Sequence, residues 1–164
     1  MDKIIDNNLT SKQDLLKRYF GYDNFRDGQE VLIDSILSGR DCLGVMPTGA
    51  GKSLCFQLPA IMMEGMTLVI SPLISLMKDQ VDALRKNGIS AAYINSSLSS
   101  LQIDKVLQNA QNGAYKLMYI APERLDLESF LLYARKASIS MVTVDEAQTA
   151  SRFRIYCNSN QQCA

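Results

Sequence analysis

The segment MPTGAGKS, residues 46–53, combines residue types that suit phosphate binding. Its two glycines permit backbone angles that side chains forbid, so successive N–H groups can point inward and surround phosphate oxygens. Lys52 is placed to reach the β- and γ-phosphates of a nucleotide, and the hydroxyl of Ser53 is placed to bind Mg²⁺. The usual form of this loop begins with glycine, whereas this chain has Met46 there. The alternative is a glycine-rich turn that only connects a strand to a helix.

A second segment, VTVDEAQTA at residues 142–150, places two carboxylates directly after an apolar run. If this run is a strand in the same sheet as the loop, Asp145 lies at the carboxyl edge and can hold Mg²⁺ through water, because this ion keeps much of its hydration shell. Glu146 can then orient or deprotonate an attacking water. The alternative is a solvated acidic turn. The position of the two acids downstream of a phosphate loop favours the catalytic interpretation.

The composition is that of a globular domain with no net charge. Of 164 residues 47% are hydrophobic, and 17 basic residues balance 17 acidic ones. Bulk charge therefore gives no argument for a nucleic-acid partner, and such binding would have to be local. The four cysteines form no C-x-x-C pair and there is no histidine, so a zinc site of ordinary spacing is not expected. Cys42 and Cys55 lie in apolar segments, and we expect buried thiols in a reducing compartment.

The N-terminus and the lengths of the apolar runs predict where in the cell the protein is located. The N-terminus, MDKIIDNNLTSKQD, is polar and does not resemble a signal peptide. No apolar run approaches the ~20 residues that span a membrane. We therefore expect a cytoplasmic protein without membrane contact.

Short apolar segments alternate with amphipathic ones along most of the chain. Strands are predicted over residues 42–46, 67–71, 91–94, 116–120 and 140–144, with helices over residues 52–63, 74–87, 100–112 and 127–136. Two helices are predicted upstream, one within LTSKQDLLKRYFGY, capped by Thr10 or Ser11 and ended by Gly21, and one within FRDGQEVLIDSILSGR, ended by Gly39. This alternation predicts an α/β fold, a parallel sheet with helices on both faces.

The pattern predicts one domain followed by a tail. We assign residues 1–148 to the domain, with its first helical segment at 10–39, and residues 149–164 to a divergent tail for which we expect disorder. After the fifth predicted strand the chain has no room for another strand–helix unit. The sheet is therefore expected to be incomplete at its C-terminal end, with an open edge that favours self-association.

Five segments resemble, in order and spacing, the motifs of a RecQ-type DNA helicase. They are YFGYDNFRDGQ, MPTGAGKS, VISPLISLMKDQV, YIAPERL and VDEAQ. The resemblance covers about Leu15 to Gln148 and corresponds to most of the first RecA-like motor domain of superfamily two, a P-loop NTPase domain. It implies an ATP-binding lobe of an enzyme that uses ATP and Mg²⁺, translocates 3′ to 5′, and unwinds DNA in recombination and repair.

The resemblance implies a role for individual residues at the nucleotide. Tyr22 and Arg26 would pack on the adenine ring and Gln29 would hydrogen-bond its edge; the alternative is a helix cap followed by an amphipathic helix. The phosphate loop would bind through Pro47, Thr48, Gly49, Ala50, Gly51, Lys52 and Ser53, with Ser53 and Asp145 holding Mg²⁺. The catalytic set would be Lys52, Asp145, Glu146 and Gln148.

Two further motifs resemble those that contact single-stranded or forked DNA. In SPLISLMKDQ, Ser71 and the start of the next helix could hold a phosphate, with Lys78 as the nearest cation. In APERL, Arg124 is the matching cation. The alternatives are an ordinary Ser-Pro turn before an amphipathic helix, and a structural pair between Glu123 and Arg124.

The chain also departs from the family pattern. Gln148 replaces the histidine of Asp-Glu-Ala-His, and an amide cannot titrate or carry charge. Beyond it, the family's tryptophan-containing loop is absent, and so is the second lobe, whose arginine can be worth ~10³–10⁵ in rate. We therefore expect these 164 residues to bind ATP or ADP weakly without unwinding DNA. Two alternatives are a non-catalytic nucleotide-binding or interaction protein from a degenerate helicase gene, and a small-molecule kinase, which would need a lid and an acceptor site.

Overall fold

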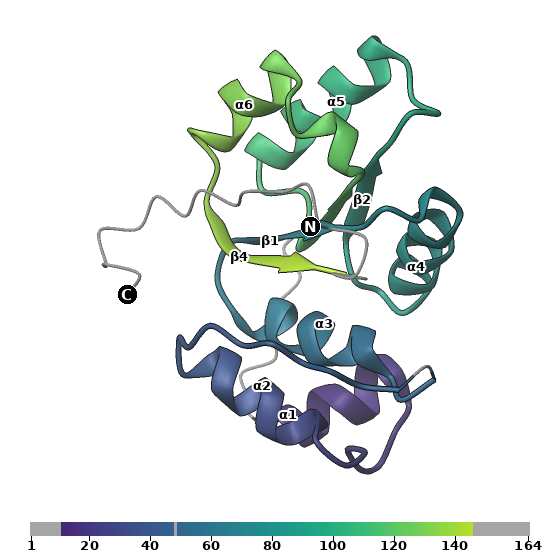
Figure 1. The fold of residues 1–164 in the computed structure, drawn as a ribbon, viewed down its shortest axis with the longest axis vertical. Coiled ribbons are helices and arrows are strands. Elements are labelled where there is room, and N and C mark those ends of the chain that lie inside the picture. The colour runs from purple at the N-terminus through teal and green to yellow at the C-terminus, as the bar shows by residue number, and fades with distance from the viewer. Residues whose placement is uncertain (1–10, 48, 146–164) are drawn as a thin grey trace.

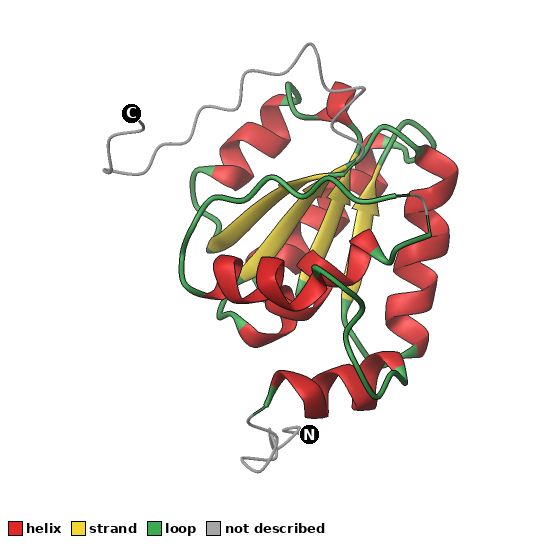
Figure 2. Cartoon of the chain, turned by 60° about the horizontal axis from the view of Figure 1, so that its bottom comes forward, coloured by secondary structure: helices red, strands yellow, loops and turns green. Residues whose placement is uncertain are grey.

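Four strands pair in parallel to form one sheet within the described part of the chain (Figures 1 and 2). The computed structural model describes residues 11–47 and 49–145. The strands are β1 (Met66–Ile70), β2 (Ala91–Ile94), β3 (Leu117–Ile120) and β4 (Ile139–Val144), in the spatial order β2-β3-β1-β4. The helices are α1 (Lys12–Leu15), the π-helical η1 (Leu16–Phe20), α2 (Gln29–Leu37), α3 (Lys52–Met62), α4 (Ile74–Lys86), α5 (Ser100–Gln111), the 3₁₀ turn η2 (Pro122–Arg124) and α6 (Glu128–Ala134).

Helices cover both faces of the sheet, so the predicted α/β architecture is confirmed (Figure 2). Alternate residues of β1 point to opposite faces, as in any strand. Val69 packs with residues of α3 and α4, whereas Leu68 and Ile70 pack with residues of α5 and α6. Every residue of β1 is buried, which explains why its sequence is a continuous apolar run.

A third apolar cluster attaches the N-terminal helices to α3. Leu16 of η1 and Ile33 of α2 pack against Leu54 and Leu58 of α3, and all four side chains are buried. Lys12 adds ion pairs with Glu30 and Asp34 of α2. The predicted helical segment thereby forms an outer layer over α3 (Figure 1).

The predicted helix ends lie close to the observed ones. Ser11 is the N-cap of α1, and its hydroxyl accepts a hydrogen bond from the N–H of Asp14 at 3.1 Å. Gly21 and Gly39, at φ 75° and 78°, follow the last helical turns as predicted. Thr10, the other candidate cap, lies outside the described residues.

The register of the sheet determines which residues meet at its carboxyl edge. Ile70 of β1 pairs with Ile120 of β3 and with Val144 of β4. The next residue after β4 is Asp145, whose N–H donates to the carbonyl oxygen of Ile70 at 2.9 Å. The predicted metal-binding carboxylate is therefore fixed beside the end of β1.

The strand predicted over residues 42–46 is wrong. This segment is extended but forms no strand, and the side chains of Leu43 and Val45 are 83% and 89% exposed. An apolar run without a neighbouring strand to supply hydrogen bonds has no ladder to join. The prediction that Cys42 is buried is wrong for the same reason, whereas Cys55 on α3 is buried as predicted.

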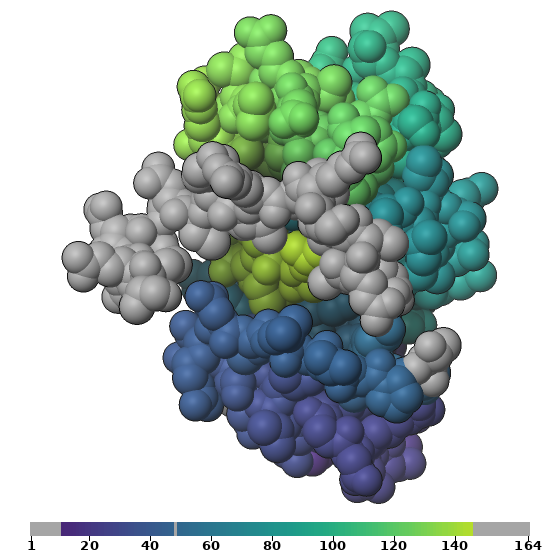
Figure 3. All heavy atoms as spheres, viewed as in Figure 1, coloured from purple at the N-terminus to yellow at the C-terminus, as the bar shows by residue number. Residues whose placement is uncertain are grey.

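β4 is an edge strand of the observed sheet. Its residues are only partly buried, and some of its atoms are visible near the centre of Figure 3, coloured yellow-green. This agrees with the expectation of an open edge at this end of the sheet. Among residues 11–47 and 49–145, no helix has the length and apolar content that crossing a bilayer requires. The predicted tail, residues 149–164, lies outside the described residues.

Candidate functional site

A cavity of about 450 Å³ lies where the phosphate loop, the outer helical layer, α4 and the end of β4 meet. It is lined by eight of the residues that the sequence singles out: Tyr22, Arg26, Gln29, Gly49, Gly51, Lys52, Ser53 and Asp145. These come from three stretches that are far apart in the chain, residues 22–29, residues 49–53 and Asp145. The fold therefore brings together the segment predicted to contact adenine (residues 19–29, the adenine motif), the phosphate loop and Asp145, which were predicted separately.

The phosphate loop turns sharply before α3 begins. The N–H of Ala50 donates to the carbonyl oxygen of Pro47 at 3.1 Å, and Gly51 is the N-cap of α3 with φ 79°. At this φ a side chain is strained, and a Cβ on Gly51 would lie 2.6 Å from Nε2 of Gln29. Glycine is therefore required both by the backbone angle and by the close approach of a buried amide.

The start of α3 faces the cavity with the features of an anion site. The first N–H groups of a helix lack carbonyl partners within it and carry the positive end of the helix dipole. Lys52 and Ser53 are the first two residues of α3, and both line the cavity. Of the other loop residues, Pro47 and Ala50 line a neighbouring hollow, and Thr48 lies outside the described residues.

Gln29 holds the phosphate loop in place. Its side chain is only 2% exposed, and its Nε2 donates to the carbonyl oxygens of Ala50 at 3.2 Å and Gly51 at 3.1 Å. Its Oε1 accepts from the N–H of Arg26 at 2.8 Å. Arg26 itself donates from its guanidinium to the carbonyl oxygen of Gly49. The adenine motif is thus bonded directly to the loop.

These bonds bear on the predicted contacts with adenine. Both N–H groups of the Gln29 amide are used by the loop, and one lone pair of its oxygen is used by Arg26. Contact between Gln29 and a base stays a prediction, and it would require the other lone pair or a rearranged amide. Tyr22, 51% exposed, borders the same cavity.

Two oxygen-bearing side chains that line the cavity suit Mg²⁺. The hydroxyl of Ser53 and the carboxylate of Asp145, which is 9% exposed, line one cavity. Mg²⁺ prefers oxygen ligands and commonly takes one or two protein groups together with phosphates and water. No group of three or more His, Cys, Asp or Glu residues gathers among the described residues, so the protein offers no complete metal cage there. The residues present fit a metal that arrives with a nucleotide.

Several residues around the cavity were not predicted from the sequence. They are Phe20, Asn24, Leu54, Gln57, Leu76 and Gln80. Gln57 carries a signal that could have been used, since it is a polar residue within an apolar helix segment, LCFQLPA. A polar side chain at such a position requires buried partners. The partners themselves lie on α4 and β3, which the sequence of α3 does not reveal.

Tyr119 supplies one of those buried partners. Burial raises the pKa of its hydroxyl well above the ordinary value, a hydrogen bond from Gln57 lowers it, and the nearby charge of Asp145 raises it further. The hydroxyl therefore stays protonated and can donate a hydrogen bond. Its oxygen is 3.0 Å from Nε2 of Gln57 and 2.7 Å from Oε1 of Gln80.

The residues predicted to contact DNA differ in their exposure. Lys78 is exposed on α4, whereas Ser71 is 2% exposed and its N–H donates to the carbonyl oxygen of Ile120 at 3.1 Å. Arg124 in η2 is half-buried, and its Nε is buried without a hydrogen-bond partner among the described residues. Of the three, Lys78 is the one that is exposed. Glu146 and Gln148 lie outside the described residues.

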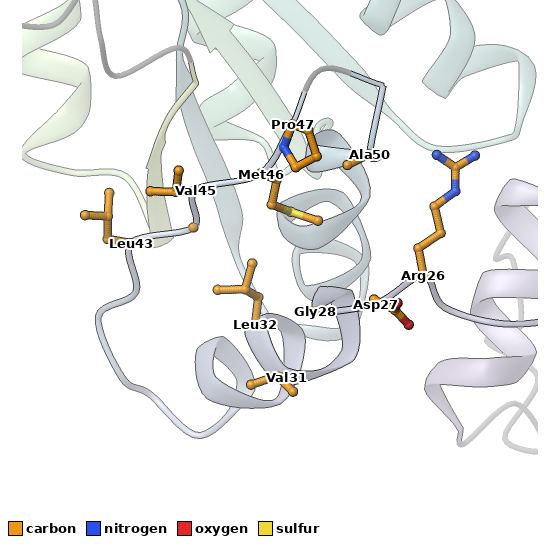
Figure 4. Close-up of a pocket in the computed structure, with 11 residues that line it drawn as sticks. Arg26, Asp27, Gly28, Val31, Leu32, Leu43, Val45, Met46, Pro47 and Ala50 are labelled. Carbon is orange, nitrogen blue, oxygen red and sulfur yellow. The ribbon is translucent and has the colours of Figure 1, made fainter.

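A second hollow, of about 680 Å³, lies between α2 and the extended segment 43–47 (Figure 4). Leu32 of α2 lies beneath this segment, and a Cβ on Gly44 would approach its Cδ1 to 2.9 Å. Arg26 borders both hollows. The phosphate-binding features described above belong to the smaller one.

Sequence comparison finds similarity to proteins described as helicases. The family described as DEAD/DEAH box helicase matches residues 26–156. The chain is 51% identical over 146 residues to the ATP-dependent DNA helicase RecQ of Bacillus subtilis (strain 168), covering 88% of this chain and 25% of that protein. It is 49% identical over 140 residues to the protein of the same name from Pasteurella multocida (strain Pm70), covering 85% and 22%. The chain therefore spans about a quarter of the length of these curated relatives.

Comparison with solved structures finds the fold of a known helicase. The crystal structure of the DUF1998 helicase MrfA superposes with a TM-score of 0.66 at 18% sequence identity, covering 88% of this chain and 24% of that one. At this identity the likeness shows the fold alone. Because the family match extends over most of the sequence, the chain belongs to the DEAD/DEAH box helicase family, with the RecA-like α/β fold.

Proposed function

We propose that this chain is the ATP-binding lobe of a RecQ-type, ATP-dependent 3′–5′ DNA helicase. The observation that carries the proposal is the single cavity that holds the start of α3, Lys52, Ser53 and Asp145 beside the adenine motif. The similarity to RecQ helicases supports the same assignment. DNA as partner and a cytoplasmic location are parts of this proposal.

The protein groups would act on the nucleotide in distinct ways. The N–H groups at the start of α3 and the ammonium of Lys52 bind and orient the phosphates. The hydroxyl of Ser53 and the carboxylate of Asp145 would hold Mg²⁺, which neutralises charge on the β- and γ-phosphate oxygens. Gln29 and Arg26 bond the loop carbonyls and would thereby keep them turned away from the anion. Glu146 is proposed to orient the attacking water.

A titration with a fluorescent ATP analogue in the presence of Mg²⁺ tests the proposal. Lys52→Ala is expected to lower nucleotide affinity at least tenfold, because charge-assisted bonds to phosphate are lost. Lys86→Ala, which removes an exposed lysine at the far end of α4, is the matched control and is expected to leave affinity unchanged. Equal affinity in Lys52→Ala and wild type would show that the loop is vestigial and would favour the interaction-protein alternative.

The DNA partner requires a separate measurement. Binding of labelled single-stranded and forked oligonucleotides is expected to weaken in Lys78→Ala and to depend less steeply on salt, because one phosphate contact is removed. Translocation needs two lobes that move relative to each other, so these 164 residues alone are expected to show no unwinding. Robust unwinding by the purified chain would refute that part of the proposal.

A further inference from the structure

A polar cluster, buried at Gln57 and Tyr119 and half-buried at Ser53 and Gln80, borders the candidate metal site. It joins α3, α4 and β3 through Ser53, Gln57, Gln80 and Tyr119. Gln57 is 7% exposed and Tyr119 is 1% exposed. Such groups are costly to bury without partners, so a cluster in which each side chain is bonded holds its members in defined orientations.

The hydrogen bonds determine which way the amide of Gln80 points. Its Oε1 accepts from the hydroxyl of Tyr119 at 2.7 Å and from Nε2 of Gln57 at 3.2 Å. With the Gln57 amide oriented as it is, turning over the Gln80 amide would bring its NH₂ group against the Gln57 amide nitrogen, and both groups are donors. The two partners therefore direct Nε2 of Gln80 toward Ser53.

Ser53 receives the remaining bond of this cluster. Nε2 of Gln80 donates to Oγ of Ser53 at 3.3 Å. A hydroxyl oxygen has two lone pairs, so accepting from Gln80 uses one of them and leaves the other for a cation. The bond also restricts rotation of the hydroxyl about the Cα–Cβ bond. Gln80 thus sets the direction in which Ser53 presents its oxygen to the cavity that both residues line.

We propose that Gln80 is a positioning residue for Mg²⁺, which orients the hydroxyl of Ser53 and is itself held by Tyr119 and Gln57. The inference rests on the proposed nucleotide site and extends it to a residue on α4. Groups that orient metal ligands in this way typically contribute 10–100-fold to metal affinity. Gln80 is expected to affect nucleotide binding only when Mg²⁺ is present.

The test compares nucleotide affinity with saturating Mg²⁺ and with EDTA. The measured quantity is the Mg²⁺ enhancement, the ratio of the dissociation constant for a fluorescent ADP analogue in EDTA to that in Mg²⁺. Gln80→Met, of similar length but without the amide, is expected to reduce this enhancement about tenfold and to leave the EDTA value within about twofold. Gln108→Met, an exposed position on α5, is the matched control and should behave as wild type.

A double-mutant cycle separates positioning from a structural role. In a Ser53→Ala background the hydroxyl is gone, so Gln80→Met is expected to reduce the enhancement no further. A reduction of the same size in both backgrounds overturns the proposal. An equal loss of affinity in EDTA and in Mg²⁺ also overturns it, because that loss would reflect a collapsed loop.

A second variant and the behaviour of the wild type keep the outcome decisive. If Gln80→Met melts without cooperativity, Gln80→Asn replaces it, since the shorter amide cannot reach Ser53, and the same reduction is expected. If wild type binds the nucleotide with Mg²⁺ enhancement and both variants match it, the positioning role alone fails. If wild type binds no nucleotide under either condition, the proposed function fails and this inference falls with it.

Discussion

At the scale of single residues, the phosphate loop depends on its contacts with Gln29 of α2. The amide of Gln29 bonds two loop carbonyls, and its Nε2 lies 2.6 Å from the position that a Cβ on Gly51 would take. The side chains that fit at positions 29 and 51 therefore depend on each other sterically. A change in either one alters both the backbone of the loop and a buried hydrogen-bonding group.

Gly51→Ala is expected to destabilise the protein more than Gly88→Ala. Both glycines have a φ near 80°, where a side chain costs roughly 1–2 kcal/mol, but nothing lies within 4 Å of the Cβ position at Gly88. At Gly51 the new methyl also displaces Gln29, at a further cost of about 1–3 kcal/mol in buried hydrogen bonds. Urea unfolding measures both costs. Equal destabilisation by the two substitutions, or an excess that persists in a Gln29→Ala background, would contradict the clash.

Tyr119 predicts a fall in stability at high pH. Burial raises the pKa of its hydroxyl above the ordinary 10.0, so the native state keeps a proton that the unfolded chain loses. The stability from this group is complete below pH 10 and declines above it, by up to about 1.4 kcal/mol per pH unit. Tyr119→Phe should be less stable at pH 7 but lose stability less steeply above pH 10.

Unfolding in urea at pH values from neutral to 11 measures this slope. The matched control is Tyr22→Phe, at a position where the side chain is 51% exposed. Raised pKa values of Cys55, Tyr133 and Lys12 act in the same direction, so some decline remains in every variant. Parallel curves for wild type and Tyr119→Phe would contradict the assignment.

At the scale of elements, β4 combines a functional end with an open edge. It carries Asp145 at its carboxyl end, yet its burial is incomplete and Val142 is 43% exposed. An edge strand presents unpaired N–H and C=O groups that another chain can join. The segment 42–46, which was predicted to be a strand, contributes no pairing to this edge.

Val142→Lys is expected to reduce self-association of the protein. A lysine on an edge strand opposes pairing with a second chain, because the charge would have to be desolvated. Sedimentation velocity across a range of concentrations measures the effect. Leu101→Lys makes the same charge change at an exposed position on α5, 83% exposed, and is expected to leave association unchanged. A wild-type chain that stays monomeric at every concentration would contradict the prediction.

At the scale of the whole molecule, the sheet separates two apolar cores, and the N-terminal layer adds a third cluster over α3. α3 contributes Phe56 to the core on one face of the sheet and Leu58 to the cluster beneath the outer layer. The helix that begins at the phosphate loop is thus packed on two sides. Exposure of its buried residues requires loss of that packing.

The reactivity of the cysteine thiols is expected to report the packing of α3. Cys42 is exposed, whereas Cys55 on α3 is 6% exposed and burial raises the pKa of its thiol. With Cys157 and Cys163 replaced by serine, Cys42 should react at once with a thiol reagent. Cys55 should react on the order of 10³-fold more slowly, because the reagent reaches it only when the protein unfolds. Urea should accelerate only the slow phase, and Cys55→Ser should abolish it. A single fast phase for both thiols would contradict the packing.

The sequence predicted most elements because their signals are local. β1 is a continuous apolar run, and Gly21 and Gly39 mark helix ends whatever surrounds them. The segment 42–46 had the same apolar signal as β1 and formed no strand. An apolar run indicates burial on a sheet only if a neighbouring strand is available, and this condition depends on the rest of the fold.

The sequence by itself determined the residues that carry chemistry, from the glycine loop with Lys52 and Ser53 to the acid at position 145, because their types and spacing reflect local backbone geometry. The tertiary structure decided which of them share a cavity, through the register that sets Asp145 beside Ile70. It alone showed that Gln29 supports the loop and that Gln80 bonds to Ser53. Hydrogen bonds between side chains that are distant in sequence arise from packing, and no local pattern encodes them.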